Sequence, residues 1–384
     1  MNILHAYKAY RPDLSGGIPA VISTLCGRTA GISNEIVVAR LRGFGRRYML
    51  DGTWVRAALS VGNWLSMPIA PTYPFVLMRR FRGADVVVHH APFPLNDLAI
   101  LLGLPRQRKP LIIFWHADIV GRSFFRTLLS PILSYAVRRA DRIVVSDESV
   151  ARQSPMLAKI GSQLRVVPYG LDTAYWSTLD DAQRREAERR RALHPRLLVT
   201  VGRLVPYKGF DVLLRALTEV DAEAIVIGEG PLRAELEQQA AALGVADRVT
   251  FASGVSDDDL KVWLHAARVF VLPSRTVAEA FGLVQIEAMA TALPIVNTDL
   301  PTAVPRIARN RQEALTVPAE DPVALAGAIR RLLDDPALAA DLGAAGRRRA
   351  MAEYDKSVFI RRMVDLYNEA VRGNQDAPTS ASPR

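Results

Sequence analysis

The stretch LLVTVGRLVPYKGFDVLLRAL (197–217) decides the fold that this sequence predicts. It opens with a short apolar run rich in Val and Leu, passes through a loop with two glycines and ends in a helical pattern. Apolar runs of this length that alternate with helical segments are typical of parallel strands buried on both faces of a sheet. The stretch therefore predicts one strand–loop–helix unit of an α/β domain.

The same alternation continues along the whole chain, with six apolar runs in each half. In order they are NILHAY, EIVVAR, ADVVVHHA, LIIFWHAD, RIVVSD, LRVVPYG, LLVTVGRL, AEAIVIGEG, RVTFASG, RVFVLPS, LPIVNT and EALTVP. A chain of 384 residues exceeds the length at which a single core stops growing. We expect two doubly wound α/β domains, with ligands bound outside the carboxyl ends of the strands in a cleft between the domains.

Two cations lie in the loop between the strand and the helix of the opening stretch. Arg203 and Lys208 are close to Gly202 and Gly209 and precede the helix at Phe210. Cations at the end of a strand can neutralise a diphosphate whose charge grows as its bond to a sugar breaks. A solvated basic turn is the alternative interpretation. The carboxylate motif that follows favours phosphate binding.

That motif is AEAFGLVQIEAMA (278–290), in which Glu279 and Glu287 are eight residues apart. Gly282 suits a turn where backbone approaches a ligand closely, and Ile286 begins a buried helical pattern. Glu279 is therefore expected in a loop and Glu287 in the helix, both near a helix N-terminus that favours anions. Carboxylates suit sugar and ribose hydroxyls. The spacing alone also fits a loop Glu followed by a helix-surface Glu.

The first half carries two further candidates. SGGIPAVISTL (15–25) follows the first strand, and Gly16 and Gly17 permit close approach of backbone to a phosphate. The segment is not a GxGxxG fingerprint, which disfavours an NAD enzyme. IIFWHADIV (112–120) places His116 just past a buried strand, with Asp118 able either to orient it or to cap the next segment.

Together, these motifs resemble the retaining glycosyltransferases of the large bacterial mannosyl- and glucosyltransferase family (glycosyltransferase family 4-like), which have the GT-B fold. The resemblance runs from residue 1 to 373. It implies that Arg203 and Lys208 bind the donor diphosphate, Glu279 binds the transferred sugar and Glu287 the nucleotide ribose. It also places His116 close to the transferred sugar, as a catalytic residue with Glu279, Arg203 and Lys208.

Further donor-binding positions follow from the same resemblance. IGEGPLRAELE (227–237) matches the family's strand-to-helix turn beneath the nucleotide, and VTFASGVSDDDL (249–260) matches the segment that meets the base. The remaining expected donor-binding residues are Gly16, Gly17, Gly228, Val255, Phe281, Gly282 and Leu283.

The resemblance implies transfer with retention, and neither metal nor cofactor is expected because cations and helix N-termini can carry the phosphate charge. No further Asp or Glu in a matching motif presents itself as a nucleophile for a covalent intermediate. We interpret Asp257–Asp259 as helix capping, not as a metal motif. The adjacent His89 and His90 point apart on a strand and predict no zinc site.

The closest likeness within the family is to O-antigen and exopolysaccharide mannosyltransferases, on HAYKAYRPDLSGGIPAVI, FWHADIV, RRADRIVVSDESVARQSP and IVNTDLPTAVP. It implies mannose transfer from GDP-mannose to a polyprenyl-diphosphate-linked saccharide. The alternatives are a transferase for glucose, galactose, N-acetylglucosamine or rhamnose, an NDP-sugar epimerase, and a catalytically dead partner protein.

Some positions depart from the family pattern. Ala292 and Ala314 stand where the family usually has glycine, and its Gly-Gly loop reads LPTAVP here (300–305). An alanine forced to positive φ costs about 1 kcal/mol. These loops are therefore expected to be reshaped, which leaves the sugar specificity open.

The expected domains are 1–172, binding acceptor and completed by a returning helix at 354–372, and 173–353, binding the nucleotide sugar. Residues 373–384 are polar and are expected to form a disordered tail. The crossover between the domains is expected between Leu171 and His194, where residues 180–196 (DDAQRREAERRRALHPR) are polar and favour a helix. Cys26 is expected to be a buried, inert thiol in a reducing compartment.

The basic charge lies in the first domain. Residues 1–175 carry 22 Lys/Arg against 10 Asp/Glu, whereas the remainder carries 27 against 29. Basic residues mixed with aromatic ones favour an anionic leaflet, although solvated faces are the alternative and no nucleic-acid module is recognised. No signal peptide is recognised, so we expect a cytoplasmic protein at the inner face of the cell membrane.

The uncharged segment 57–78 is long enough to span a bilayer, but its prolines argue against a continuous helix. We expect a helix that ends near Met67, followed by an extended connection.

Overall fold

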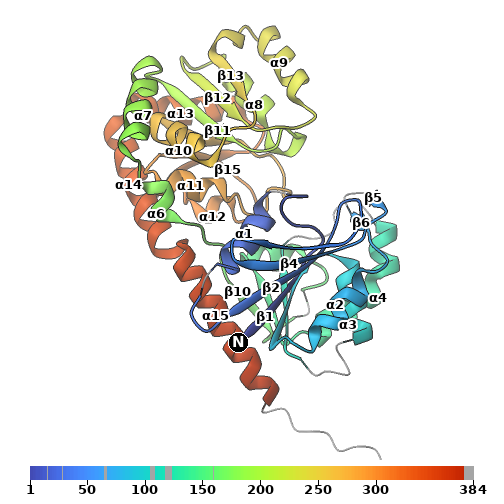
Figure 1. Ribbon diagram of the computed structural model, residues 1–384. Coiled ribbons are helices and arrows are strands. Elements are labelled where there is room, and N and C mark those ends of the chain that lie inside the picture. The colour runs from blue at the N-terminus through green and yellow to red at the C-terminus, as the bar shows by residue number, and fades with distance from the viewer. Residues whose placement is uncertain are drawn as a thin grey trace, which may run out of the picture. The chain divides into compact units, whose positions relative to one another are not determined.

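A computed structural model describes residues 1–14, 16–27, 29–64, 67–103, 109–116, 123–158 and 160–375 (Figure 1). The chain divides into two compact units. The first unit comprises Met1–Gly170 and Ser357 onward, and the second comprises Leu171–Lys356. The first unit thus ends two residues before the expected boundary at 172.

The first unit is built on an eight-stranded sheet with the order β10-β9-β8-β7-β1-β2-β4-β3. All paired neighbours run parallel except β3 and β4. The order reverses between β1 and β7, which makes this the switch point of a doubly wound sheet. The strands are β1 (Asn2–Ala6), β2 (Ser33–Ala39), β3 (Arg46–Leu50), β4 (Thr53–Ala58), β7 (Val86–Ala91), β8 (Leu111–Trp115), β9 (Arg142–Val145) and β10 (Leu164–Val166).

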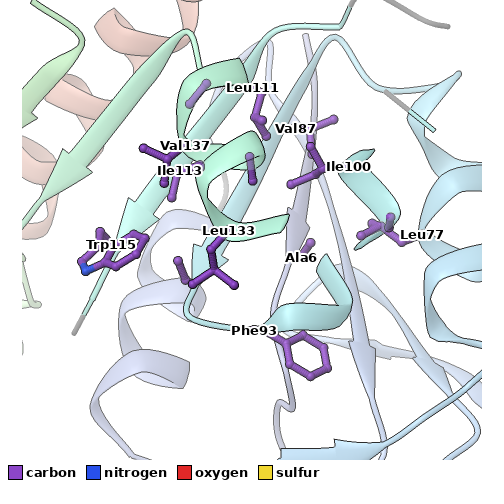
Figure 2. Packing of buried hydrophobic residues seen from close by; sticks show 14 of the residues in the cluster. Ala6, Leu77, Val87, Phe93, Ile100, Leu111, Ile113, Trp115, Leu133 and Val137 are labelled. Atoms are coloured by element: carbon purple, nitrogen blue, oxygen red, sulfur yellow. The ribbon is translucent and has the colours of Figure 1, made fainter. Parts of the chain in front are cut away.

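Helices cover this sheet because its strands are apolar on both faces. Figure 2 shows Leu133 and Val137 of α4 beside Leu111 and Ile113 of β8, within one buried cluster. A second cluster joins α1 to β2, and Phe359 of α15 packs against Phe114. The helices are α1 (Gly17–Leu25), α2 (Tyr73–Phe81), α3 (Pro94–Gly103), α4 (Ser123–Arg139), α5 (Glu148–Gln153) and α15 (Lys356–Gln375).

The expectation of a helix ending near Met67 is wrong. Instead of a helix, residues 57–78 contain the end of β4, the hairpin of β5 (Gly62–Trp64) and β6 (Met67–Ile69), and the start of α2. The helix α2 begins at Tyr73, after Pro68 and Pro71, and Pro74 fits its first turn, where the missing N–H is not needed. In the described part of the chain, none of the helices combines the length and apolarity needed to cross a bilayer.

The second unit is built on a six-stranded, wholly parallel sheet with the order β13-β12-β11-β14-β15-β16. This is the dinucleotide-fold order 3-2-1-4-5-6, with its switch point between β11 and β14. All twelve runs predicted from the sequence are strands. The six here are β11 (Leu197–Val201), β12 (Glu223–Ile227), β13 (Val249–Ala252), β14 (Val269–Leu272), β15 (Ile295–Asp299) and β16 (Ala314–Pro318).

The helices of the second unit follow the strands in sequence. A capping box starts the polar helix α7, in which Asp180 and Gln183 satisfy each other's backbone N–H groups. The helices of this unit are α6 (Thr173–Ser177), α7 (Asp181–Leu193), α8 (Phe210–Ala216), α9 (Arg233–Ala242), α10 (Asp257–Ala266), α11 (Val284–Ala290), α12 (Val304–Ile307), α13 (Pro322–Asp334) and α14 (Pro336–Glu353).

The final helix is longer than the sequence predicted. It runs to Gln375, whereas the disordered tail was expected to begin at Gly373. Glu369 accepts hydrogen bonds from Arg142 at 2.7 Å and from Arg165 at 2.8 Å, which ties the helix to β9 and β10. The expected tail from 376 to 384 lies outside the described residues.

Only one of the two alanines that replace family glycines has positive φ. Ala292 has φ 60° in the loop after α11, whereas Ala314 begins strand β16 without positive φ. Ala314 therefore carries none of the strain that an alanine at positive φ would have. The backbone at Ala292 is also closely packed, since a Cβ on Gly343 would lie 2.1 Å from the Ala292 carbonyl oxygen.

We expect Ala292→Gly to raise the free energy of unfolding by about 0.5 kcal/mol. Relief of left-handed strain, about 1–2 kcal/mol, exceeds the entropy that a glycine adds to the unfolded chain, about 0.4–1 kcal/mol. Urea unfolding measures the difference. The matched control is Ala344→Gly, exposed within α14, which should lower the free energy by about 1 kcal/mol. A loss of stability in both variants would contradict the prediction.

Candidate functional site

Two close backbone approaches shape the loop after β11. Gly209 has φ 68°, and a Cβ there would lie 2.0 Å from the Pro273 carbonyl oxygen at the end of β14. A Cβ on Gly202 would lie 2.9 Å from Cε of Lys208. The loop therefore folds the lysine back over the carboxyl end of β11, and both positions need glycine.

Lys208 and Glu279 meet at this strand end. The Lys208 Nζ lies 2.5 Å from Glu279 Oε2, and the exposed fractions of the two side chains are 10% and 9%. Ser274 Oγ donates a further hydrogen bond of 3.1 Å to the same oxygen. The two opposite charges compensate each other. Either charge, if buried without its partner, would cost several kcal/mol of folding free energy. The residue expected to bind diphosphate and the residue expected to bind sugar are thus each other's partner in this structure.

Glu279 lies in a loop and Glu287 in α11, as the sequence predicts for both. Between them Gly282 has φ 78°, and a Cβ there would lie 3.1 Å from the Leu272 side chain. Phe281 is buried beside this turn, and Leu283 is half-buried at the N-cap of α11. The turn therefore fixes where the loop ends and the helix starts.

The carboxyl of Glu287 is half-buried and electrostatically unusual. Its pKa is raised to about 7, first by desolvation and then by the carboxylate of Asp257, with the ammonium of Lys208 opposing both. Near neutral pH the side chain is thus divided between its neutral and ionised forms. The carboxyl can therefore either donate a hydrogen bond to a ribose hydroxyl or accept one from it.

We expect Glu287→Gln to make the folded protein more stable above pH 7. Between the ordinary carboxyl pKa and about 7 the folded state holds a proton that the unfolded state has lost, so stability falls as pH rises through this window. The variant should gain about 1–3 kcal/mol at pH 8 and almost nothing at pH 4.5. Urea unfolding at both values measures this. Glu235→Gln, on an exposed position of α9, is the control, and an equal gain at both pH values would contradict the prediction.

Gly228 lies next to this centre. It has φ 153°, and a Cβ there would lie 1.9 Å from the Gly202 carbonyl oxygen, so the ends of β11 and β12 are in backbone contact. Arg203 is exposed in the loop after β11. Val255 is half-buried between Gly254 and the N-cap of α10.

The acidic run beside Val255 lies in the first turn of α10. Ser256 provides the cap by accepting a hydrogen bond from the Asp259 backbone N–H, so the capping role expected of the aspartates belongs to Ser256. Asp258 accepts hydrogen bonds from Tyr175 and Gln183, and Asp259 pairs with Arg190. Over the described ranges, no group of His, Cys, Asp and Glu side chains is arranged to hold a metal ion.

In the first unit, Gly16 and Gly17 open α1. Gly16 is the N-cap, with φ 133°, and both glycines are exposed. A Cβ on Gly16 would meet no atom within 4 Å, so the backbone angle, not a lack of space, requires glycine there.

His116 follows β8 directly and is 4% exposed. Its Nε2 lies 2.9 Å from His90 Nδ1, and its Nδ1 lies 2.6 Å from the Tyr169 hydroxyl. Burial lowers its pKa to about 3. The ring is therefore neutral at physiological pH, with both nitrogens hydrogen-bonded inside the first unit. Asp118, expected to orient it, lies outside the described residues.

Sequence reasoning missed two histidines linked to His116. His90 contacts it directly, and His5 of β1 contacts His90. Adjacent His89 lies on the other face of β7, 2.9 Å from Asp97, so the two neighbours do point apart as expected. Alternation along β7 was a usable signal for the orientation of His90, but nothing in the sequence paired β7 with β1 and β8.

Comparison with known families covers both units. Residues 15–175 match the family described as Glycosyltransferase Family 4, and residues 182–349 match Glycosyl transferases group 1. The structure of Anabaena Alr3699/HepE in complex with UDP is similar in fold, with a TM-score of 0.76 and 18% identity over 96% of this chain and 100% of that one.

Curated relatives extend over nearly the whole chain. The D-rhamnosyltransferase WbpZ of Pseudomonas aeruginosa is 32% identical over 92% of this chain and 91% of its own length. The O-antigen chain mannosyltransferase C of Escherichia coli is 28% identical over 96% of this chain and 98% of its own. Taken with the two doubly wound sheets, these matches show that the chain belongs to the GT-B glycosyltransferases of group 1, the family 4-like enzymes.

Proposed function

We propose that this glycosyltransferase moves mannose, with retention, from GDP-mannose to a lipid-linked saccharide acceptor during the synthesis of a bacterial surface polysaccharide. The Lys208–Glu279 pair at the carboxyl end of β11 carries the proposal, because it joins a cation for diphosphate to a carboxylate for sugar hydroxyls. The names of two relatives support mannose as the transferred sugar. D-Rhamnose is 6-deoxy-D-mannose, so a rhamnosyltransferase and a mannosyltransferase transfer sugars of one configuration.

The side chains of the second unit divide the donor between them. Lys208 and Arg203 hold the diphosphate and take up the charge that grows on it as the sugar leaves. Glu279 accepts hydrogen bonds from the hydroxyls of the sugar, and Glu287 meets the ribose. Gly228, Val255, Phe281, Gly282 and Leu283 line the same donor, with Gly16 and Gly17 presenting the N-terminus of α1.

The acceptor hydroxyl loses its proton to the departing diphosphate, on the face of the sugar that the diphosphate leaves. His116 lies beside the sugar. Its ring is neutral, because its lowered pKa prevents it from taking up a second proton at neutral pH. Neither a metal ion nor a cofactor is required when cationic side chains carry the phosphate charge.

A panel of nucleotide sugars tests donor and chemistry together. Purified full-length protein is incubated with GDP-mannose, GDP-linked rhamnose, and UDP-linked glucose, galactose and N-acetylglucosamine, with a lipid-linked acceptor and with or without EDTA. We expect nucleoside diphosphate release to be fastest with GDP-mannose, unchanged by EDTA, and to give an anomer of retained configuration. Faster release from another donor would show that the sugar of that donor, not mannose, is transferred. A product that is only an epimerised nucleotide sugar would show that the protein is an epimerase.

An exposed apolar edge of the first unit supports a lipid-bound acceptor. Seven of the thirteen large hydrophobic side chains exposed among the described residues fall within 44–75. Residues 40–82 carry eight arginines and a single acidic residue, Asp51. The hairpin β5–β6 brings part of this apolar edge together, since Val61 N–H donates to the Ile69 carbonyl at 3.0 Å. The most exposed members are Phe44, Val61, Phe75, Trp64 and Met49.

We propose that the apolar edge rests on the anionic inner leaflet of the cell membrane. Aromatic side chains suit the interface, and each nearby arginine adds about 1 kcal/mol of attraction to an anionic surface. Sedimentation with vesicles tests this. We expect binding to phosphatidylglycerol vesicles that weakens with salt, and a loss of at least about tenfold in Phe44→Ser/Trp64→Ser. Val323→Ser, equally exposed but in α13, should bind normally; equal loss in this control would contradict the proposal.

A further inference from the structure

Three buried histidines form one hydrogen-bonded chain across the sheet of the first unit. His116 Nε2 lies 2.9 Å from His90 Nδ1, and His90 Nε2 lies 3.1 Å from His5 Nδ1. The chain ends at the Tyr169 hydroxyl, 2.6 Å from His116 Nδ1, and at Asn34 Oδ1, 3.3 Å from His5 Nε2. Tyr169 follows the carboxyl end of β10, whereas Asn34 lies near the start of β2.

The direction of every hydrogen bond in this chain follows from Asn34. Its Nδ2 donates to the Leu25 carbonyl oxygen at 3.4 Å, so its Oδ1 faces His5 and must accept. His5 therefore donates through Nε2 and, as a neutral ring, accepts at Nδ1. The same alternation then applies to His90 and to His116. Each ring carries its hydrogen on Nε2, and the Tyr169 hydroxyl donates to the last Nδ1.

The surroundings of the chain keep all three rings neutral. Burial lowers the pKa of His5 to about 4 and that of His116 to about 3, and it also lowers the pKa of His90. The rings stack on one another and on Phe114, with 7° between the planes of His90 and His116. The facing titratable groups are the hydroxyls of Tyr7 and Tyr169, whose pKa values burial raises, and the ring of His89, whose charge would lower the pKa of His90 and of His116.

We propose that His5 and His90 are positioning residues that hold His116 in the single tautomer with its hydrogen on Nε2. The proposal rests on the placement of His116 beside the transferred sugar. The fixed tautomer leaves Nδ1 to accept the hydrogen bond of the Tyr169 hydroxyl at the carboxyl edge of the sheet, where a doubly wound domain meets its ligand, so the ring is held from both sides. A ring free to exchange tautomers would lose these two hydrogen bonds for part of the time and would keep its place beside the reacting sugar less firmly.

The tautomers can be observed directly in the wild-type protein. Ring nitrogen signals of histidine-labelled full-length protein distinguish the two neutral tautomers from each other and from the cation. We expect His5, His90 and His116 to show hydrogen on Nε2 at every pH between 5 and 8. A hydrogen on Nδ1 of any of the three, or titration of one of them within this range, would overturn the proposal.

Two substitutions at one position separate positioning from packing. His90→Gln keeps an acceptor for His116 and a donor for His5, whereas His90→Leu keeps neither. With the leucine we expect kcat to fall at least about tenfold while the donor KM changes by less than about threefold, and with glutamine most of kcat to return. Equal losses in the two variants, or a kcat that follows the melting temperature alone, would show that the chain only fills the core.

His116→Ala distinguishes a failure of this inference from a failure of the proposed function. If that variant keeps normal kcat, His116 does not act on the sugar and the proposed catalytic role falls. The ring signals of the wild type would still report whether His5 and His90 fix the tautomer. If His116→Ala loses kcat but His90→Leu does not, the catalytic role stands and the positioning role is wrong.

Discussion

Glu279→Gln is expected to lower kcat at least about tenfold, equivalent to roughly 1.4 kcal/mol of transition-state stabilisation. In the proposed site its carboxylate meets the sugar where the bond breaks, and interactions realised mainly in the transition state affect kcat. The same change should leave binding of free nucleoside diphosphate at least as tight as in the wild type. The reason is the 2.5 Å contact with Lys208, which a diphosphate must replace and which the glutamine weakens in advance.

Glu287→Gln is the matched comparison, since it changes the same functional group in α11. A ribose does not change during transfer, so this variant should mainly raise the donor KM and weaken the binding of free nucleoside diphosphate. Steady-state kinetics and calorimetric titration measure the two effects. If the loss of nucleotide binding falls on Glu279→Gln while Glu287→Gln binds like the wild type, the two roles are reversed.

Lys208→Met is expected to lower kcat at least about a hundredfold, the usual cost of removing one donor to developing negative charge. It should also destabilise the protein by about 3–5 kcal/mol, because Glu279 is then a buried carboxylate without its cation. Single-turnover measurement at saturating donor gives the first effect, and urea unfolding gives the second. A nearly normal rate at saturating donor would show that the lysine does not bind the diphosphate.

The double variant Lys208→Met/Glu279→Gln separates catalysis from folding. It removes both charges of the pair, so most of the lost stability should return. Its turnover should remain as low as that of Lys208→Met, since neither diphosphate nor sugar regains its partner. Recovery of turnover together with stability would mean that the single variant failed only because it was poorly folded.

The parallel strands were readable from the sequence because buried parallel strands are continuous apolar runs. RVFVLPS and LPIVNT needed no knowledge of their neighbours to be recognised. Residues 57–78 show where this reasoning fails. An uncharged segment of that length favours a helix on composition, but β4 takes its first residues into the sheet, and β5–β6 form a hairpin that exposes Trp64 and Ile69. Pairing with β2 overrides the local pattern there.

The candidate site was predictable residue by residue but not as an arrangement. Motifs placed Glu279 in a loop and Glu287 in a helix, since Gly282 marks the boundary between them. They did not predict that Lys208 would meet Glu279, because the contact depends on how β11 and β14 lie side by side. His5 and His90 were likewise invisible as partners, because their strands lie far apart in the sequence and become neighbours only in the sheet.

The contact between Lys208 and Glu279 has a consequence for which small molecules the enzyme ignores. A free hexose offers Glu279 its hydroxyls but gives the lysine nothing in exchange for a lost carboxylate, so it must leave a buried cation uncompensated. A nucleotide sugar supplies both replacements in one molecule. If the pair binds the donor as proposed, occupancy requires a phosphate attached to the sugar, and abundant unactivated hexoses in the cell would be poor competitors for the donor.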